Sequence, residues 1–511
     1  MDIADISLIG SGVAGTVTLI EVLDTLLNNP PPSKKLRVAV IEKYHEFWKG
    51  IPYGNRSSIN ALTITSIHEF IHEPERHLFF EWLKSSKNDW ISYYREHGGI
   101  IADNWLKNNL PFIKNEEWEN IYVPRFLFGN YLSQKFTSLL KTAEEKQLVE
   151  FKLVQAEAID INVMAGGLHE IILEHPDNIL SKIITRKLVV ATGSPPVKKI
   201  CEISDNKTMY VNDIYEPSLS ENLNKLHTHL NKRSEAGERN ILIIGSNASC
   251  IELLYLMQGM PEFTVLINKM VVISTSGSLP YYTSTEILPD HPTPNLDKLK
   301  ASGDYNIEKL VEGAALDIAL AIQNGANMDY VATIIFQTLT LLEVLDEDAK
   351  KLFFAIYAIH LHNMFRRAGP EYRNAAQFLI DFQRVIIVRG AFLNICSSEK
   401  GSFLNYLDME TSQQRTYPLD FKAIINCSGS ADLESSSSRL LFNLVNKNIC
   451  RMNLSRKGFE VNEKFEAAPN IYIMGPLLGG NVNKLIHFWQ LENAARLTYL
   501  APYLTEELLN I

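Results

Sequence analysis

The sequence has few cysteines for its length, five in 511 residues. No two of them stand in the Cys-x-x-Cys spacing of a metal site, so the spacing indicates neither a zinc site nor a disulfide framework. It also argues against a dithiol reductase, which needs two neighbouring cysteines to exchange electrons with its cofactor. We expect reduced, mostly buried thiols in a cytoplasmic protein. The cysteines are Cys201, Cys250, Cys396, Cys427 and Cys450.

The chain also lacks an excess of basic residues and any long apolar run. Its formal net charge is -10, which disfavours binding to phosphate backbones and to anionic lipid surfaces. No stretch reaches the roughly 18 uninterrupted apolar residues of a membrane-spanning helix. The first apolar residues, Ile6 to Ile9, run directly into a glycine motif and not into a cleavage site. We therefore expect no nucleic-acid or membrane partner, and a cytoplasmic protein that acts on a small molecule.

That glycine motif is the clearest signal in the sequence. It reads Gly10-Ser-Gly12-Val-Ala-Gly15 and lies between an apolar run at residues 3–9 and a helical pattern that extends to about residue 27. A second apolar run, residues 37–41, ends at Glu42. This order of strand, glycine turn, helix, strand and acid predicts a Rossmann-type βαβ unit.

Each residue type in this unit has a physical role. Gly10 permits a tight turn, Gly12 lets the backbone approach a pyrophosphate, and Gly15 lets the helix pack closely on the strand. The N-terminus of the helix offers N–H groups to the phosphates, and Glu42 can accept hydrogen bonds from ribose hydroxyls. The unit is therefore predicted to bind a dinucleotide.

Two later apolar strands also finish in glycine, in Ala191-Thr-Gly193 and in Ile473-Met-Gly475. Brought together in one sheet, such glycines would let a long cofactor pass close to the backbone. A glycine motif so near the start is typical of flavoproteins in which FAD extends along the first domain, so FAD is the predicted cofactor. The residues expected to contact it are Gly10, Gly12, Val13, Ala14, Gly15, Glu42, Lys43, Thr192, Gly193, Gly475 and Gly480.

A second βαβ candidate begins after a charged loop at residues 232–239. Its first strand is residues 240–244, its turn reads Gly245-Ser-Asn-Ala-Ser249, and its second strand is residues 271–274. Gly245, Asn247 and Ala248 are the residues expected at a second nucleotide. Residues 306–382 then show helical spacing.

We therefore predict an α/β fold with two Rossmann-like dinucleotide-binding domains and a helical insertion. The FAD domain, with a three-layer ββα arrangement, should comprise residues 1–198 and 384–511. The second nucleotide domain should comprise residues 199–300, and the helical segment residues 301–383. The last helix is expected from about residue 485 to residue 504.

Taken together, these motifs make the chain resemble the family of FAD-NAD(P)-binding proteins, which is related to flavin-containing and N-hydroxylating monooxygenases. The matching stretches span nearly the whole chain, and the most particular of them is Pro-Arg-x-x-x-Gly-x-Tyr-Leu. They are Gly10–Gly15, Gly50–Gly54, Val123–Leu132, Ala191–Gly193, Gly245–Ser249, His362–Pro370 and Ile471–Gly480.

The resemblance implies roles for several further residues. It places Arg125 near the cofactor or the substrate entrance, whereas its type alone is equally compatible with a surface ion pair. It places Tyr53 and Asn60 in a loop over the flavin ring, where Asn60 would contact bound nicotinamide or a peroxyflavin. These two are our candidate catalytic residues. The alternative for Asn60 is a residue that stabilises a turn, and for Trp48 a core position is the better interpretation.

The sequence departs from the family pattern at the second nucleotide site. Asn247 stands where the fingerprint has glycine, and its side chain would crowd a pyrophosphate. The strand that follows ends Ile273-Ser-Thr-Ser-Gly-Ser278, without the arginine that often holds the 2′-phosphate of NADPH in this family. The second cofactor is thus predicted as NADPH or NADH, and a vestigial site stays an alternative.

The remaining polar clusters have simpler interpretations. His68 and His72 lie one helical turn apart without an evident third ligand, so no metal site is predicted. Arg366 and Arg367 stand at the end of a helical pattern, where they would either cap its C-terminus or neutralise an anionic substrate. We favour the cap.

Three functions remain open from the sequence. The first is a monooxygenase in which a nicotinamide nucleotide reduces FAD and O2 then hydroxylates a small substrate, such as an amine or amino acid. The second is an oxidase or dehydrogenase whose substrate reduces FAD directly. The third is a flavin-binding scaffold that presents the helical segment to a partner; a large exposed apolar stripe there would favour it.

Overall fold

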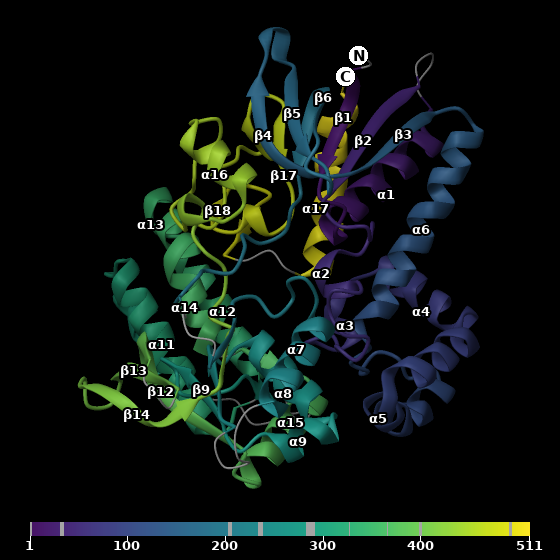
Figure 1. Ribbon diagram of the computed structural model, residues 1–511. Coiled ribbons are helices and arrows are strands. Elements are labelled where there is room, and N and C mark those ends of the chain that lie inside the picture. Colours follow the sequence, from purple (N-terminus) through teal and green to yellow (C-terminus); the bar gives the residue numbers. More distant parts are fainter. Residues whose placement is uncertain are drawn as a thin grey trace.

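The computed structural model describes residues 3–30, 35–202, 207–232, 239–282, 292–326, 328–364, 366–397, 401–489 and 493–510. Two bodies, each built around a parallel sheet, and a block of helices make up the molecule (Figure 1). No helix among these residues is long and apolar enough to cross a membrane.

The first sheet has five adjacent parallel strands in the order β17-β6-β1-β2-β3. They are β1 (Ala4–Ile9), β2 (Leu36–Glu42), β3 (Val149–Gln155), β6 (Leu180–Val190) and β17 (Ile471–Ile473). Every residue of β1 is buried because strands flank it on both sides and helices cover it. The order places the first strand of the chain in the middle of the sheet.

An antiparallel meander and a layer of helices complete this domain. β4 (Glu157–Val163) pairs with β5 (His169–Glu174), and β5 pairs with the beginning of the long strand β6. Helix α1 (Val13–Asn28) packs against both α6 (Arg125–Glu145) and α17 (Ala494–Leu509). This is the predicted three-layer ββα domain.

Four helices lie between β2 and α6. They are α2 (Gly50–Tyr53), α3 (Ile67–Phe70), α4 (Glu75–Ser85) and α5 (Lys87–Lys114), which kinks at Gly99 with φ +59°. They enclose aromatic side chains such as Phe79 and Trp105, which are fully buried. Residues 67–145 are thus mostly helical.

The second sheet is parallel over β12-β9-β8-β15-β7 and continues into an antiparallel extension. Its parallel strands are β7 (Met209–Val211), β8 (Ile241–Ile244), β9 (Met270–Ser274), β12 (Val385–Ser397) and β15 (Ala423–Asn426). The extension is β13 (Ser402–Asp408) and β14 (Gln414–Phe421), and the helices are α7 (Leu219–Asn231), α8 (Ala248–Gln258), α9 (Pro261–Leu266) and α15 (Pro370–Asp381).

This sheet corrects the predicted domain boundaries. Residues 385–426 were expected in the FAD domain, but β12 pairs with β9, and β15 pairs with both β8 and β7. The chain rejoins the first sheet only at β16 (Glu466–Ala468) and β17. The reason is topological: β15 is fully buried and apolar up to its last residue, Asn426, which suits either sheet, and pairing partners cannot be read from composition.

The helical block has a core of its own. Its helices are α10 (Pro294–Ser302), α11 (Ile307–Gln323), α12 (Met328–Leu342), α13 (Glu347–Leu352) and α14 (Ala358–Met364). Their buried apolar side chains form a separate cluster, which includes Leu310, Ile334 and Phe353. Val482 and Trp489, from the segment before α17, pack against that cluster.

The last helix starts later than predicted. Residues 487–488 form β19 (His487–Phe488), which pairs with β18 (Asn481–Val482). Helix α17 begins at Ala494, where the side chain of Asn493 caps it by accepting a hydrogen bond from the amide of Ala495 at 2.7 Å. The apolar pattern continued through the short hairpin and hid the boundary.

Candidate functional site

The first glycine loop connects β1 to α1, and its glycines differ in what an added side chain would meet. Gly10 has φ +94°, and a Cβ added there would lie 2.5 Å from the carbonyl oxygen of Ala191. A Cβ at Gly15 would overlap the carbonyl of Gly10 and lie 2.9 Å from the side chain of Leu8. At Gly12, an added Cβ meets only the Cα of Gly50, at 3.6 Å. The fold requires glycine at 10 and 15, and position 12 leaves space beside the backbone, as a bound pyrophosphate requires.

Three glycine-containing strand ends meet beside this loop. The register Ile9↔Val190 and Val190↔Ile473 aligns the ends of β1, β6 and β17. Gly193, with φ +82°, has no atom within 4 Å of an added Cβ, and Gly475, with φ +94°, packs against Ala14. Thr192 lies beside Gly193 at the same edge. The sequence-based expectation that these glycines share one sheet edge is confirmed.

Glu42, at the end of β2, is hydrogen-bonded to the glycine loop. One carboxylate oxygen accepts hydrogen bonds from the amide and the hydroxyl of Ser11, at 2.8 and 2.9 Å. The other accepts from the amide of Tyr44 at 3.2 Å. The carboxylate is thus fixed next to the loop, in the place predicted for ribose recognition. The Nζ of Lys43 lies 3.5 Å from the Oε2 of Glu157.

Gly480 belongs to a different local environment. Its φ is +86°, and an added Cβ would lie 2.8 Å from the side chain of Ser455 and 3.1 Å from the Oδ1 of Asn453. The neighbouring loop therefore accounts for glycine at this position.

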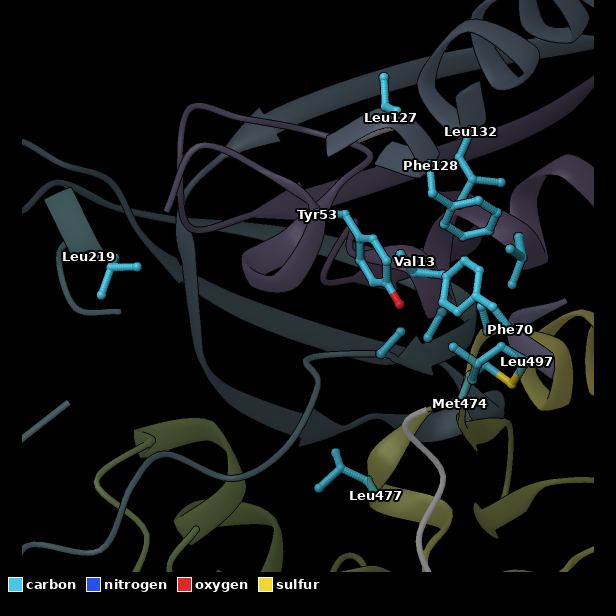
Figure 2. Close-up of a cluster of buried hydrophobic side chains, with 14 of the residues drawn as sticks. Val13, Tyr53, Phe70, Leu127, Phe128, Leu132, Leu219, Met474, Leu477 and Leu497 are labelled. Atoms are coloured by element: carbon cyan, nitrogen blue, oxygen red, sulfur yellow. The ribbon is translucent and has the colours of Figure 1, made fainter. Parts of the chain in front are cut away.

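Tyr53 lies in a buried aromatic cluster. Its ring centroid is 5.5 Å from that of Phe128 and 6.1 Å from that of Phe70. Figure 2 shows Tyr53 beside Val13, the first residue of α1, with Met474 close by. The structure thus gives Tyr53 a packing role directly behind the glycine loop.

Asn60 connects the segment after α2 to helix α5. Its Nδ2 donates to the carbonyl of Gly98 at 2.9 Å, next to the kink in α5. Its Oδ1 is buried and has no hydrogen-bond partner among the described residues. A Cβ added at Gly98 would lie 2.8 Å from this oxygen. The side chain thus joins two segments that are 38 positions apart in sequence and does not act within a local turn, and the catalytic role of Asn60 stays a prediction.

Arg125, at the start of α6, forms a buried ion pair with Glu252 of α8. The Nη2–Oε2 distance is 2.5 Å, and the two side chains are 13% and 5% exposed. Arg125 also donates to the hydroxyl of Ser57 at 3.0 Å, and the hydroxyl of Tyr215 donates to Glu252 at 2.9 Å. Burial is the largest single effect and lowers the pKa of Arg125. The charge of Glu252 and smaller contributions from neighbouring tyrosines together raise it more, so the pKa lies above its usual value.

This ion pair excludes the surface salt bridge that the residue type allowed, because both groups are buried and join the two nucleotide domains. The position near the cofactor or the substrate entrance stays a prediction. Glu252, Tyr215 and Ser57 were missed by sequence reasoning. The one available signal was Glu252 itself, an acid inside the otherwise apolar run of α8.

The second glycine loop repeats the construction of the first. The amide of Gly245 donates to the carbonyl of Ile273 at 2.8 Å, as the amide of Gly10 donates to Ile41 at 2.9 Å. Gly245 has φ +101° and packs on the carbonyl of Cys427. Asn247 is the N-cap of α8, the position that Gly12 holds in α1, and Ala248 is the first residue of that helix. The asparagine side chain makes no capping hydrogen bond.

A pocket of about 240 Å³ lies beside Tyr53, between the α2 segment, α5 and α6. Its lining carries polar and charged groups, which suit a small polar molecule. They include Lys49, Asn55, His97 and Asn130. A larger pocket of about 500 Å³ lies at the other end of the sheet, by Ile471 and His169.

Arg367, which follows α14, pairs with an acid and does not cap that helix. Helix α14 ends at Met364, and Arg367 lies in β11 (Arg367–Ala368), where its guanidinium is 2.7 Å from Glu69. The preference for a helix cap at Arg367 was therefore wrong, because the backbone turns into a strand first. His362 and Arg496 both lie against Trp489, with separations of 6.0 and 5.6 Å from its ring.

Known proteins resemble this chain in both sequence and fold. Residues 7–195 match a family model described as FAD-NAD(P)-binding. The uncharacterized protein Rv3403c of Mycobacterium tuberculosis is 34% identical over 511 residues, which covers 99% of this chain and 95% of that protein.

Solved structures share the fold over the whole chain. The ornithine hydroxylase of Pseudomonas aeruginosa, in its reduced form, has a TM-score of 0.56 at 13% identity and covers 99% of both chains. The cadaverine monooxygenase of the desferrioxamine pathway of Erwinia amylovora, solved with FAD bound, has a TM-score of 0.55 at 11% identity and covers 100% of this chain and 95% of its own. The predicted fold class and resemblance are confirmed. The chain belongs to the protein family that contains Rv3403c, and it has the fold of the flavin-dependent N-hydroxylating monooxygenases.

Proposed function

We propose that this protein is an FAD-dependent monooxygenase that uses a nicotinamide nucleotide and O2 to hydroxylate the nitrogen of a small amine or amino acid. The observation that carries the proposal is the pair of glycine loops built alike on two parallel sheets, with no steric overlap for an added Cβ at Gly12. Support comes from the whole-chain likeness in fold to an ornithine hydroxylase and a cadaverine monooxygenase. Both of those proteins are named for substrates that carry a terminal primary amine.

The residues of the first loop fit FAD. Gly12 and the first turn of α1 would hold the pyrophosphate, because the first N–H groups of a helix lack acceptors within the helix. Glu42 would bind ribose hydroxyls, and the strand ends at Gly193 and Gly475 would lie along the cofactor. Gly480 would contribute only by allowing its own loop to pack tightly against Ser455.

When bound, FAD would supply the redox chemistry of the reaction. Overall, the reduced nicotinamide would give up an electron pair, one oxygen atom would enter the new N–O bond, and the other would leave as water with two protons. The substrate amine would become a hydroxylamine.

The protein itself would position the reactants and exclude water. Val13, Tyr53 and Met474 belong to one buried cluster, which makes the region next to the first glycine loop apolar. The ion pair of Arg125 and Glu252 would fix one nucleotide domain relative to the other. The pocket beside Tyr53 would admit a small polar substrate; Lys49, whose Nζ lies 3.4 Å from the Oε1 of Glu46, contributes to its lining.

A second candidate is an oxidase or dehydrogenase that lacks a working nicotinamide site. Asn247 favours it, because an asparagine occupies the N-cap position that Gly12 holds in the first domain. The scaffold alternative gains less support. Phe336 and Val344 of the helical block are 69% and 78% exposed, but the block also packs on Val482 and Trp489 of the chain's own C-terminal segment.

The test is an absorbance spectrum of the purified protein, followed by anaerobic addition of NADPH and of NADH. Oxidised flavin bands that bleach with either nucleotide support the proposal. Oxygen uptake and hydroxylamine formation across a panel of diamines and basic amino acids would then identify the substrate. Flavin that stays oxidised with both nucleotides, but bleaches with an amine, favours the oxidase. No flavin after reconstitution with FAD would overturn the assignment.

A further inference from the structure

The two nucleotide domains can be aligned residue by residue from their strand registers. Ile9 pairs with Ile41 in the first sheet, and Ile244 pairs with Ile273 in the second. In each domain the first glycine after the central strand donates its amide to the second isoleucine of the pair. The next residues along the chain, Glu42 and Ser274, therefore hold equivalent places.

This equivalence means that the second domain has a serine where the first has its ribose-binding acid. A carboxylate there would accept hydrogen bonds from a free 2′-hydroxyl and would repel a 2′-phosphate. Ser274 carries no charge and offers a hydroxyl. The position is therefore compatible with a phosphorylated ribose, whereas Glu42 is not.

The loop after Ser274 is compact and rich in hydroxyl groups. The amide of Gly277 donates to the hydroxyl oxygen of Ser274 at 3.1 Å, and the hydroxyls of Ser274 and Ser276 lie 3.2 Å apart. Gly277 has φ +63°, which turns the loop back toward the sheet. The residues are half-buried or exposed, so a ligand can reach them.

The cation that this loop lacks is supplied by the neighbouring strand. Arg389 of β12 is the direct register partner of Ser274. Its aliphatic stem lies against Gly277, since a Cβ added at Gly277 would be 2.6 Å from the Cβ of Arg389 and 2.8 Å from its Cγ. Arg389 follows Ser274 by 115 positions in the sequence (389 minus 274), yet it lies next to the loop in space.

No described residue forms an ion pair with Arg389. The acid nearest in register is Asp408, opposite Gly390. Its carboxylate is held by Arg415 at 3.2 Å and by the amides of Glu410 and Thr411. The exposed guanidinium of Arg389 is thus available to an anion.

We propose that Arg389, together with the hydroxyls of Ser274 and Ser276, binds the 2′-phosphate of NADPH, and that these residues set the nucleotide preference of the second site. The inference rests on the proposed function for the role of that site. The arginine that the family pattern places in the loop after Ser274 is supplied here by β12, as Arg389.

The experiment measures binding of adenosine 2′,5′-bisphosphate and of adenosine 5′-monophosphate to the FAD-loaded protein by calorimetry. We expect the bisphosphate to bind at least about tenfold more tightly, since charge-assisted contacts to one phosphate are worth a tenfold factor or more. Arg389→Gln should remove this preference, and Ser274→Glu should abolish it by repulsion. Arg95→Gln, the same charge change at an exposed position of α5, should keep it.

The outcomes separate this inference from the proposed function. Equal affinity of the wild-type protein for the two probes, binding of neither, or a preference that survives Arg389→Gln would overturn the inference. Flavin reduction plays no part in the binding measurement. A protein that prefers the bisphosphate but whose flavin is not reduced by NADPH would uphold the 2′-phosphate site and contradict the monooxygenase.

Discussion

Gly12 and Gly15 stand three residues apart, yet an added Cβ at the first would only touch Gly50, at 3.6 Å, whereas at the second it would overlap backbone. Gly12 has φ -68° and ψ -173°, a conformation that any residue adopts. Gly12→Ala should therefore fold with an unchanged melting temperature. Its methyl group would occupy the space that we assign to the pyrophosphate, so we expect FAD affinity to fall at least about tenfold, as measured by fluorescence titration.

Gly15→Ala is the matched control for that variant. Its Cβ would overlap the carbonyl of Gly10, so it should destabilise the fold by about 1–3 kcal/mol. A Gly12→Ala protein with full FAD affinity would contradict the assignment of the first loop.

His362 gives a pH-dependent prediction. Burial first, and then the charges of Arg366, Arg496 and Arg367, lower its pKa from 6.5 to about 4. In the unfolded chain the ring takes up a proton near pH 6.5, so the unfolded state binds more protons between pH 6.5 and pH 4. The contribution of neutral His362 to stability is therefore complete above pH 6.5 and is lost as the pH falls toward 4.

We expect His362→Gln to flatten the fall of the melting temperature between pH 6.5 and pH 4. His360→Gln is the control, because His360 is exposed on the same helix. If both variants keep the wild-type slope, the acid sensitivity comes from other groups.

At the residue scale, local chemistry was predictable and distant partners were not. The roles of Gly10 and Gly15 follow from a short motif whose turn geometry is local. The ion pair of Arg125 could not be predicted, because its partner, Glu252, is 127 positions away by subtraction and belongs to the other domain. Tyr53 was assigned by resemblance, and its aromatic neighbours became visible only in the fold.

At the element scale, the capping of helices in the helical block leads to another prediction. Asp317 of α11 is fully buried and accepts hydrogen bonds from the amide of Leu296 at 2.9 Å and from the side-chain amide of Asn295 at 2.7 Å. It thus satisfies the N-terminus of α10, whose own N-cap residue, Thr293, makes no side-chain cap bond. Asp317→Ala leaves these donors buried and unsatisfied.

We expect Asp317→Ala to cost about 2 kcal/mol of unfolding free energy, measured by urea denaturation followed by circular dichroism. FAD content should stay unchanged, because the block has its own core. Asp304→Ala removes an exposed carboxylate from the loop between α10 and α11 and should have little effect. Equal losses in the two variants would show that Asp317 does not cap α10.

Elements with a strong period were predictable, and their assembly was not. Strands β1, β2 and β8 and helices α1 and α8 follow from apolar runs beside glycine turns. The insertion of β15 between β7 and β8 does not, because a buried four-residue strand carries no signal of its neighbours. The missing arginine after Ile273 looked like a defect in sequence, and only the register with β12 shows that Arg389 lies opposite Ser274.

At the scale of the whole molecule, Arg125 and Glu252 join the two nucleotide domains. Glu252→Ala would leave a buried guanidinium without its partner, and breaking a buried pair costs about 3–5 kcal/mol. Replacing both partners, as in Arg125→Met with Glu252→Leu, removes both charges and should recover most of that stability. Urea denaturation of the single and double variants measures the coupling.

The double variant also distinguishes the stability of the contact between the domains from their relative orientation. Met and Leu would fill the interface, but they would lose the directional hydrogen bonds to Ser57 and Tyr215. Hydride transfer requires the nicotinamide and the flavin within contact distance, so a small rotation of one domain is costly. We therefore expect the double variant to regain stability while flavin reduction by NADPH, followed by stopped-flow absorbance, stays at least about tenfold slower than in wild type. If the reduction rate returned together with the stability, the ion pair would hold the domains together without setting their geometry.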